Sequence, residues 1–133
     1  MSVLADTSGI LTLLDADEPY YQAALSYADD LLVPSTVLCE VDYLASQRLG
    51  SHVARRFLAS VAEGRVNFLE ADFKDIKLAY QLVETYADTD IGFVDASLLA
   101  LAERYRIRRL LTLDRKHFHF VQAPTLGYLE LLP

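Results

Sequence analysis

The sequence contains no apolar run near the roughly 20 residues that a membrane-spanning helix needs. The first residues, Met1 to Asp6, also lack the charged leader and apolar stretch of a signal peptide. The single cysteine, Cys39, cannot form a disulfide within the chain, and in an apolar setting such a residue is usually buried and unreactive. These absences predict a cytoplasmic protein with no membrane association and no need for an oxidising compartment.

An excess of positive charge is also lacking, since 12 basic residues face 19 acidic ones and the net charge is -7. This balance argues against a general basic surface for nucleic acid. Half of the basic residues nevertheless fall in one short stretch: Arg104, Arg106, Arg108, Arg109, Arg115 and Lys116. That stretch could attract phosphate, or it could simply solvate a helix end and a loop, and the charge pattern leaves both interpretations open.

Internal repeats, low-complexity segments and linkers are absent as well. A chain of 133 residues with 53% hydrophobic content can build one sizeable core. We therefore expect a single domain over residues 1–133.

Short apolar runs alternate with segments of helical periodicity along the chain. Strands are predicted at 2–5, 31–33, 66–69 and 110–113, with one or two weak strands between 118 and 132. Helices are predicted at 6–14, 19–30, 36–49, 51–63, 72–86 and 93–105. Helical crossovers of this length predict an α/β fold, a three-layer α/β/α sandwich with a mainly parallel sheet.

Two acids follow predicted strands directly, Asp6 after the first strand and Asp114 after Leu-Leu-Thr-Leu. In open parallel sheets the ligand site lies beyond the carboxyl ends of the strands, so both acids point at that edge. Either one alone would be explained as a helix cap or a turn residue.

Two further acids lie on apolar helical stripes. Glu40 has Leu44 at i+4, and Asp95 has Leu98 and Leu99 at i+3 and i+4. An inward-facing carboxylate costs several kcal/mol unless it is paired or binds a cation. A buried ion pair with an arginine is the alternative, but we find no basic residue on the same stripe of either helix.

Four such carboxylates would repel one another unless a divalent cation held them. Oxygen ligands suit Mg²⁺ or Mn²⁺, whereas zinc would recruit cysteine or histidine. His117 and His119 lie near Asp114, but alternating polar positions in a terminal strand usually form a solvated face. We keep these histidines only as candidate substrate contacts.

These motifs resemble those of PIN domains, particularly the VapC-type toxins of bacterial toxin–antitoxin pairs. The resemblance covers nearly the whole chain and rests on four segments in order: Asp6-Thr7-Ser8-Gly9-Ile10-Leu11, Glu40, Val94-Asp95-Ala96-Ser97, and Leu111-Thr112-Leu113-Asp114-Arg115 with Phe118.

The resemblance implies a Mg²⁺- or Mn²⁺-dependent endoribonuclease that cuts RNA, commonly tRNA or ribosomal RNA, and acts as the toxin of a type II toxin–antitoxin system. It implies a cognate antitoxin and a homodimer as partners. By position, the catalytic and metal-binding acids would be Asp6, Glu40, Asp95 and Asp114, with Asp88 or Asp90 as alternative members of the metal shell. Substrate contacts would come from Thr7, Ser8, Thr112, Arg115 and Lys116. The tyrosines Tyr20, Tyr21 and Tyr27 would serve an interface or the core equally well.

Two other functions compete with this interpretation. A phosphatase of the haloacid dehalogenase kind would carry a second aspartate two positions after the first, where this chain has Ser8, and no phospho-acceptor aspartate of a receiver domain can be placed. A non-catalytic PIN-fold module that only binds RNA or protein is the second alternative. The presence of all four acids counts against it.

Overall fold

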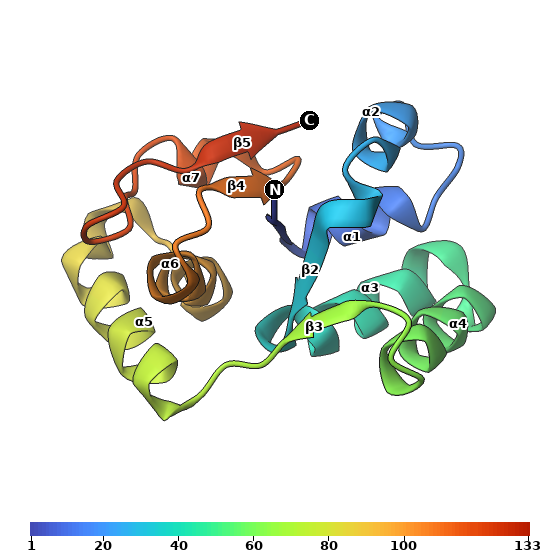
Figure 1. Cartoon of the computed structure of the whole chain (residues 1–133), viewed down its shortest axis with the longest axis horizontal. Coiled ribbons are helices and arrows are strands. Elements are labelled where there is room, and N and C mark those ends of the chain that lie inside the picture. Colours follow the sequence, from blue (N-terminus) through green and yellow to red (C-terminus); the bar gives the residue numbers. More distant parts are fainter.

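A computed structural model describes residues 1–133. Its centre is a five-stranded parallel sheet of order β3-β2-β1-β4-β5, with β1 in the middle (Figure 1). The strands are β1 Val3–Ala5, β2 Leu31–Pro34, β3 Asn67–Leu69, β4 Arg109–Leu111 and β5 Glu130–Leu132. The predicted three-layer α/β/α fold with a parallel sheet is confirmed.

Seven α-helices and three short 3-10 helices connect the strands. The α-helices are α1 Thr7–Leu13, α2 Tyr21–Leu25, α3 Leu38–Leu49, α4 Ser51–Ala62, α5 Phe73–Thr85, α6 Phe93–Tyr105 and α7 Arg115–Phe118. The 3-10 helices are η1 Ala28–Asp30, η2 Ser35–Val37 and η3 Ala87–Thr89. The helix predicted over 93–105 matches α6 at both ends, because its apolar periodicity is uninterrupted.

The long helix predicted over 19–30 is wrong. Only α2 and η1 form there, and the Ser26 hydroxyl donates to the Ala23 carbonyl, a local bond of the kind that competes with a continuing helix. Tyr20 is exposed, whereas Tyr27 packs against buried residues and lies under the Arg109 guanidinium.

The strands predicted between 118 and 132 are also partly wrong. The segment holds the end of α7, a single bridge between Ala123 and Gly127, and β5. Phe118 is 1% exposed and ends α7, so its apolar side chain anchors a helix to the core instead of beginning a strand.

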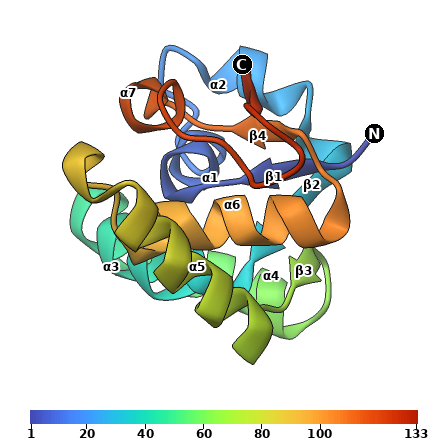
Figure 2. The same ribbon diagram turned by 90° about the vertical axis from the view of Figure 1, so that its left-hand side faces the viewer.

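Alternate strand residues face two different cores, as the pleat of a sheet requires. Leu4 and Leu110 belong to the larger core, which the helices α3 to α6 share, while Val3 and Leu111 pack with Ala24 of α2. The helix α6 is buried continuously from 96 to 102, and α5 runs beside it on the outside (Figure 2). No helix of the structure combines the length and the apolar character that crossing a bilayer requires.

Candidate active site

Asp6 is the most rigidly held of the predicted acids. It follows β1, begins α1 as its N-cap, and is 6% exposed. Its Oδ1 accepts hydrogen bonds from Ser8 Oγ at 2.7 Å and from the Gly9 amide at 2.8 Å, and its Oδ2 accepts one from Thr112 Oγ1. Burial raises the pKa of Asp6, against these three hydrogen bonds, and the nearby charge of Asp114 raises it further.

The hydroxyls of Ser8 and Thr112 join the start of α1 to the end of β4. Thr112 Oγ1 accepts from the Asp114 amide at 2.9 Å, and Ser8 Oγ accepts from the Leu113 amide at 2.9 Å. Thr112, which the resemblance assigned to substrate contact, is fully buried. Its hydroxyl instead fixes Asp6 and the backbone of Asp114 in one hydrogen-bonded network.

Gly9 permits this close approach. A Cβ at this position would lie 2.3 Å from the Leu111 carbonyl oxygen, a distance that no side chain can adopt without moving backbone. The glycine is therefore required by the packing of α1 on β4, and through it by the positions of both strand-end acids.

Asp95 and Asp114 are bridged by a histidine that sequence reasoning placed on a solvated strand. His117 Nδ1 lies 3.3 Å from Asp95 Oδ2 and 3.1 Å from Asp114 Oδ2. It reaches both because residues 115–118 form α7, which brings His117 one turn after Asp114. The expectation for His117 was thus wrong in its structural basis, and the residue belongs to the site.

The charge environment of Asp95 is strongly unfavourable to ionisation. Its side chain is 20% exposed, and burial raises its pKa to about 6. The attraction of His117 lowers this pKa, whereas Asp114, Asp6 and Glu40 all raise it. All three carboxylates therefore lie close enough to Asp95 to disfavour its ionised form.

Glu40 lies in the first turn of α3 and is exposed, so the prediction that it faces the packed interior is wrong. The buried stripe of the helix runs through Val41 and Ala45, and Glu40 lies beside it. The carboxylate instead lines an open pocket together with Asp6, Asp95 and Asp114.

That pocket has a volume of about 170 Å³ and brings the four predicted acids together. Ten residues line it: Asp6, Thr7, Ser8, Leu11, Glu40, Leu44, Arg48, Val94, Asp95 and Asp114. The helix of Glu40 does carry a basic residue on the same stripe, because Arg48 at i+8 lines the pocket too. The prediction that it carries none is wrong. The i+4 spacing from Leu44 to Arg48 was a readable signal of this placement.

The donor atoms of this site fit a divalent cation. Asp95, Asp114 and His117 each offer a ligand atom, and these atoms lie within 4.8 Å of one another. Thr7 Oγ1, at the same pocket, is buried without any hydrogen-bond partner. Clustered carboxylate oxygens suit a small hard cation, so the acidic cluster could bind a metal.

The remaining predicted residues lie elsewhere. Arg115 is exposed and donates to the Pro133 carbonyl oxygen, and Lys116 and His119 are exposed and do not line the pocket. Asp88 and Asp90 are exposed in and after η3 and do not line it either. Cys39 is exposed, contrary to the expectation of a buried thiol, because it occupies the outer side of the first turn of α3.

The concentrated basic stretch is occupied mainly by contacts within the chain. Arg104 pairs with Asp72 and Asp75, and Arg106 pairs with Glu103. The other partners are the Tyr128 carbonyl for Arg108, Glu130 for Arg109 and the Pro133 carbonyl for Arg115. Of the two interpretations left open by the charge pattern, the structure favours basic residues that stabilise helix ends and loops.

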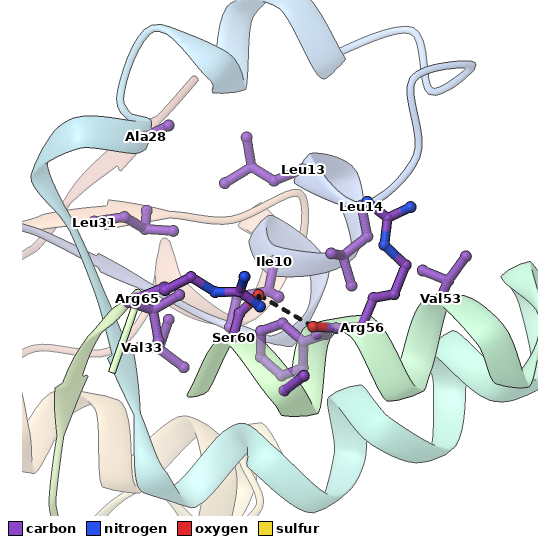
Figure 3. A pocket seen from close by; sticks show the side chains of 13 residues that line it. Ile10, Leu13, Leu14, Ala28, Leu31, Val33, Val53, Arg56, Ser60 and Arg65 are labelled. Atoms are coloured by element: carbon purple, nitrogen blue, oxygen red, sulfur yellow. Dashed lines mark hydrogen bonds between the residues drawn. The ribbon is translucent and has the colours of Figure 1, made fainter. Parts of the chain in front are cut away.

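A second cavity of about 590 Å³ lies between α1, β2 and α4 and is largely apolar (Figure 3). Leu14, which directly follows α1, and Val53 of α4 point into it, and Arg56 and Arg65 also line it. Arg65 donates to Ser60 Oγ at 3.4 Å and pairs with Glu63 at 3.1 Å, and both arginines are exposed. We call this cavity the apolar groove.

Known proteins share both the sequence pattern and the fold. A family model described as the PIN domain matches residues 3–123. Ribonuclease VapC26 of Mycobacterium tuberculosis is 36% identical over 135 residues, covering 98% of this chain and 100% of that protein.

Solved structures extend the likeness to the fold. VapC20 of Mycobacterium tuberculosis, described as a sarcin–ricin loop cleaving toxin, superposes with a TM-score of 0.80 at 20% identity, covering 99% of this chain and 100% of the other. VapBC2 of Rickettsia felis, solved bound to a DNA fragment from its promoter, gives a TM-score of 0.72 at 18% identity, with full coverage of both chains.

Proposed function

The chain belongs to the PIN-domain family, and from this premise we propose that it is a metal-dependent endoribonuclease, the toxin of a type II toxin–antitoxin pair. One observation carries the proposal: Asp6, Glu40, Asp95 and Asp114, from four separate segments, line one pocket. The 36% identical relative named a ribonuclease supports RNA as the substrate class. We propose that residues 1–133 act as one domain in the cytoplasm, on tRNA or ribosomal RNA.

We propose that these four acids hold Mg²⁺ or Mn²⁺. The bound cation would activate water and neutralise charge on the phosphate that the water attacks. Asp6 is oriented for this task by three donors, and Thr112 couples its position to that of Asp114. The chain thereby fixes its ligands before any cation or substrate arrives.

His117 would hold a proton at Nδ1 between Asp95 and Asp114. In that position it offsets part of the repulsion between the carboxylates when no cation is bound. The Thr7 hydroxyl, which has no partner in the chain, and the half-buried Ser8 would face the substrate side of the pocket. Arg115 and Lys116 would contact RNA only outside the pocket.

An antitoxin is the proposed protein partner, since several solved structures of the same fold are toxin–antitoxin complexes. We propose that it places an apolar segment with an acidic side chain in the apolar groove. The lining of Leu14 and Val53 would bury the apolar side chains, and Arg56, which forms no ion pair within the chain, would pair with the acid.

We also propose a homodimer. On α5 the residues Phe73, Ile76 and Tyr80 recur on one face and are exposed by 71%, 47% and 64%. Apolar side chains gathered on one helical face favour association. Light scattering of the purified protein would measure the mass, and a Tyr80→Glu change should shift it to that of the monomer.

The proposed activity is tested by incubating labelled total RNA with the purified protein in Mg²⁺, Mn²⁺ or EDTA. Cutting should require the metal and disappear in Asp6→Asn and Asp95→Asn, which keep size and remove charge. Asp90→Asn is the matched control, because it removes the same charge outside the pocket and asparagine tolerates the left-handed backbone there. RNA binding without cutting by well-folded, antitoxin-free protein would favour the binding-module alternative.

A further inference from the structure

Arg48 occupies a distinctive place beside the carboxylates. It lies on α3, two helical turns after Glu40, and Leu44 lies between them on the same stripe. Of the ten residues that line the pocket, it is the only basic one. A cation at the rim of a pocket that contains four acids calls for a specific explanation.

The Arg48 guanidinium is not used by the fold. The side chain is exposed and forms no ion pair with any acid of the chain, including those with which it shares the pocket. Arg104, by contrast, is bound to Asp72, Asp75 and the Glu70 carbonyl. The donors of Arg48 are therefore available to an acceptor that enters the pocket from outside.

We propose that Arg48 binds a backbone phosphate of the RNA strand, next to the phosphate that is cut; this inference rests on the proposed ribonuclease function. A guanidinium presents its donors in a planar fork that matches two phosphate oxygens. Arg48 lies eight residues after Glu40, which at about 1.5 Å per residue places its backbone about 12 Å along α3 from that of Glu40, so its fork calls for an acceptor beside the reacting phosphate. A neighbouring phosphate of the same strand meets this requirement.

The charge of the protein strengthens the argument. An RNA strand that approaches a net charge of -7 and a pocket of four carboxylates is repelled until a cation attracts it. One arginine at the rim would hold the strand beside the four acids. An acidic side chain of a protein partner would be repelled by the same four carboxylates. An RNA strand has, in addition, a second phosphate next to the first that the cation attracts, so RNA is the favoured occupant.

The test measures binding separately from cutting. Asp95→Asn protein in Mg²⁺ is titrated against a short, fluorescently labelled single-stranded RNA of mixed sequence over a series of salt concentrations. Adding Arg48→Ala should weaken binding roughly tenfold and make the slope of log affinity against log salt shallower by about 0.7, the value for one phosphate contact on a single strand. Arg48→Lys should keep the slope and regain part of the affinity, because it keeps the charge without the fork.

Arg55→Ala is the matched control, since Arg55 is exposed on the next helix, contacts only Ser51 Oγ, and does not line the pocket. Unchanged affinity and slope in this variant, with the loss in Arg48→Ala, would establish a local contact. Equal behaviour of the two variants, while wild type still cuts RNA, would overturn the role of Arg48 alone. Absence of both RNA binding and cutting would overturn the proposed function and this inference together.

Discussion

Replacing Asp95 by asparagine should stabilise the metal-free protein while abolishing its activity. Burial and three neighbouring carboxylates raise the pKa of Asp95 from its ordinary 3.8 to about 6. A difference of about 2 pKa units, at about 1.4 kcal/mol each, corresponds to at most about 3 kcal/mol of unfolding free energy. For a domain of this size, that gain would raise the melting temperature by roughly 10 °C.

The sign of the pH dependence follows from the raised pKa. Because the folded pKa exceeds the unfolded one, the stability that protonated Asp95 contributes is fully present below about pH 3.8 and is lost as pH rises through about 6. The asparagine side chain of the variant has no charge to develop and loses nothing over this range. The advantage of Asp95→Asn should therefore be small near pH 4 and reach its plateau above about pH 7.

The assay is urea unfolding in EDTA at a series of pH values, followed by circular dichroism, with Asp90→Asn as the control for removal of one charge from an exposed loop. Mg²⁺ should then stabilise the wild type more than the variant, since the cation relieves the same repulsion. An Asp95→Asn protein no more stable than wild type at pH 8, or an advantage that does not shrink in acid, would refute the reasoning.

Three further changes test how the site is held together. Gly9→Ala should destabilise the fold by roughly 1–3 kcal/mol and strongly reduce cutting, because its Cβ would meet the Leu111 carbonyl at 2.3 Å; Gly92→Ala, whose Cβ meets nothing within 4 Å, should leave unfolding unchanged in the same urea titration. Thr112→Val should cost about 1–3 kcal/mol and raise the pKa of Asp6 further, and Thr112→Ser should restore both; a Thr112→Val protein as stable as wild type would contradict the network. His117→Ala should raise the pKa of Asp95 above its present value of about 6, because a partner that lowers it is removed; carboxylate NMR in EDTA measures this directly, and an unchanged titration would exclude the contact.

The strand-end acids could be predicted because a parallel sheet leaves little freedom at its carboxyl edge. Asp6 and Asp114 each follow a central strand, and β1 and β4 are direct neighbours. Asp95 could be predicted from the uninterrupted apolar face of α6. For these three residues, local sequence pattern and global topology impose the same position.

The placement of Glu40 could be predicted only in part. Periodicity shows that Glu40 shares a stripe with Leu44, but it does not show which of two neighbouring stripes is buried. The fully buried stripe is that of Val37, Val41 and Ala45, so Glu40 is exposed while Val41 is buried. The stripe of Glu40, Leu44 and Arg48 lines the pocket instead of entering the interior.

His117 could not be predicted because four residues decide between a strand and one helical turn, and neither period is established over so short a length. The contacts of Phe118 with the core select the helix. Arg48 was within reach of sequence reasoning, since two successive i+4 steps lead from Glu40 to Leu44 and then to Arg48.

The central position of β1 has a consequence for the time at which the protein becomes active. Asp6 directly follows β1, yet its hydrogen-bond partner Thr112 lies 106 residues later, and β1 pairs with β4 along its length. Contacts over such a distance can form only after the segment up to β4 and Thr112 has been synthesised. A nascent chain therefore carries separate acids without a complete site until β4 has been synthesised, so nuclease activity cannot arise on a shorter chain.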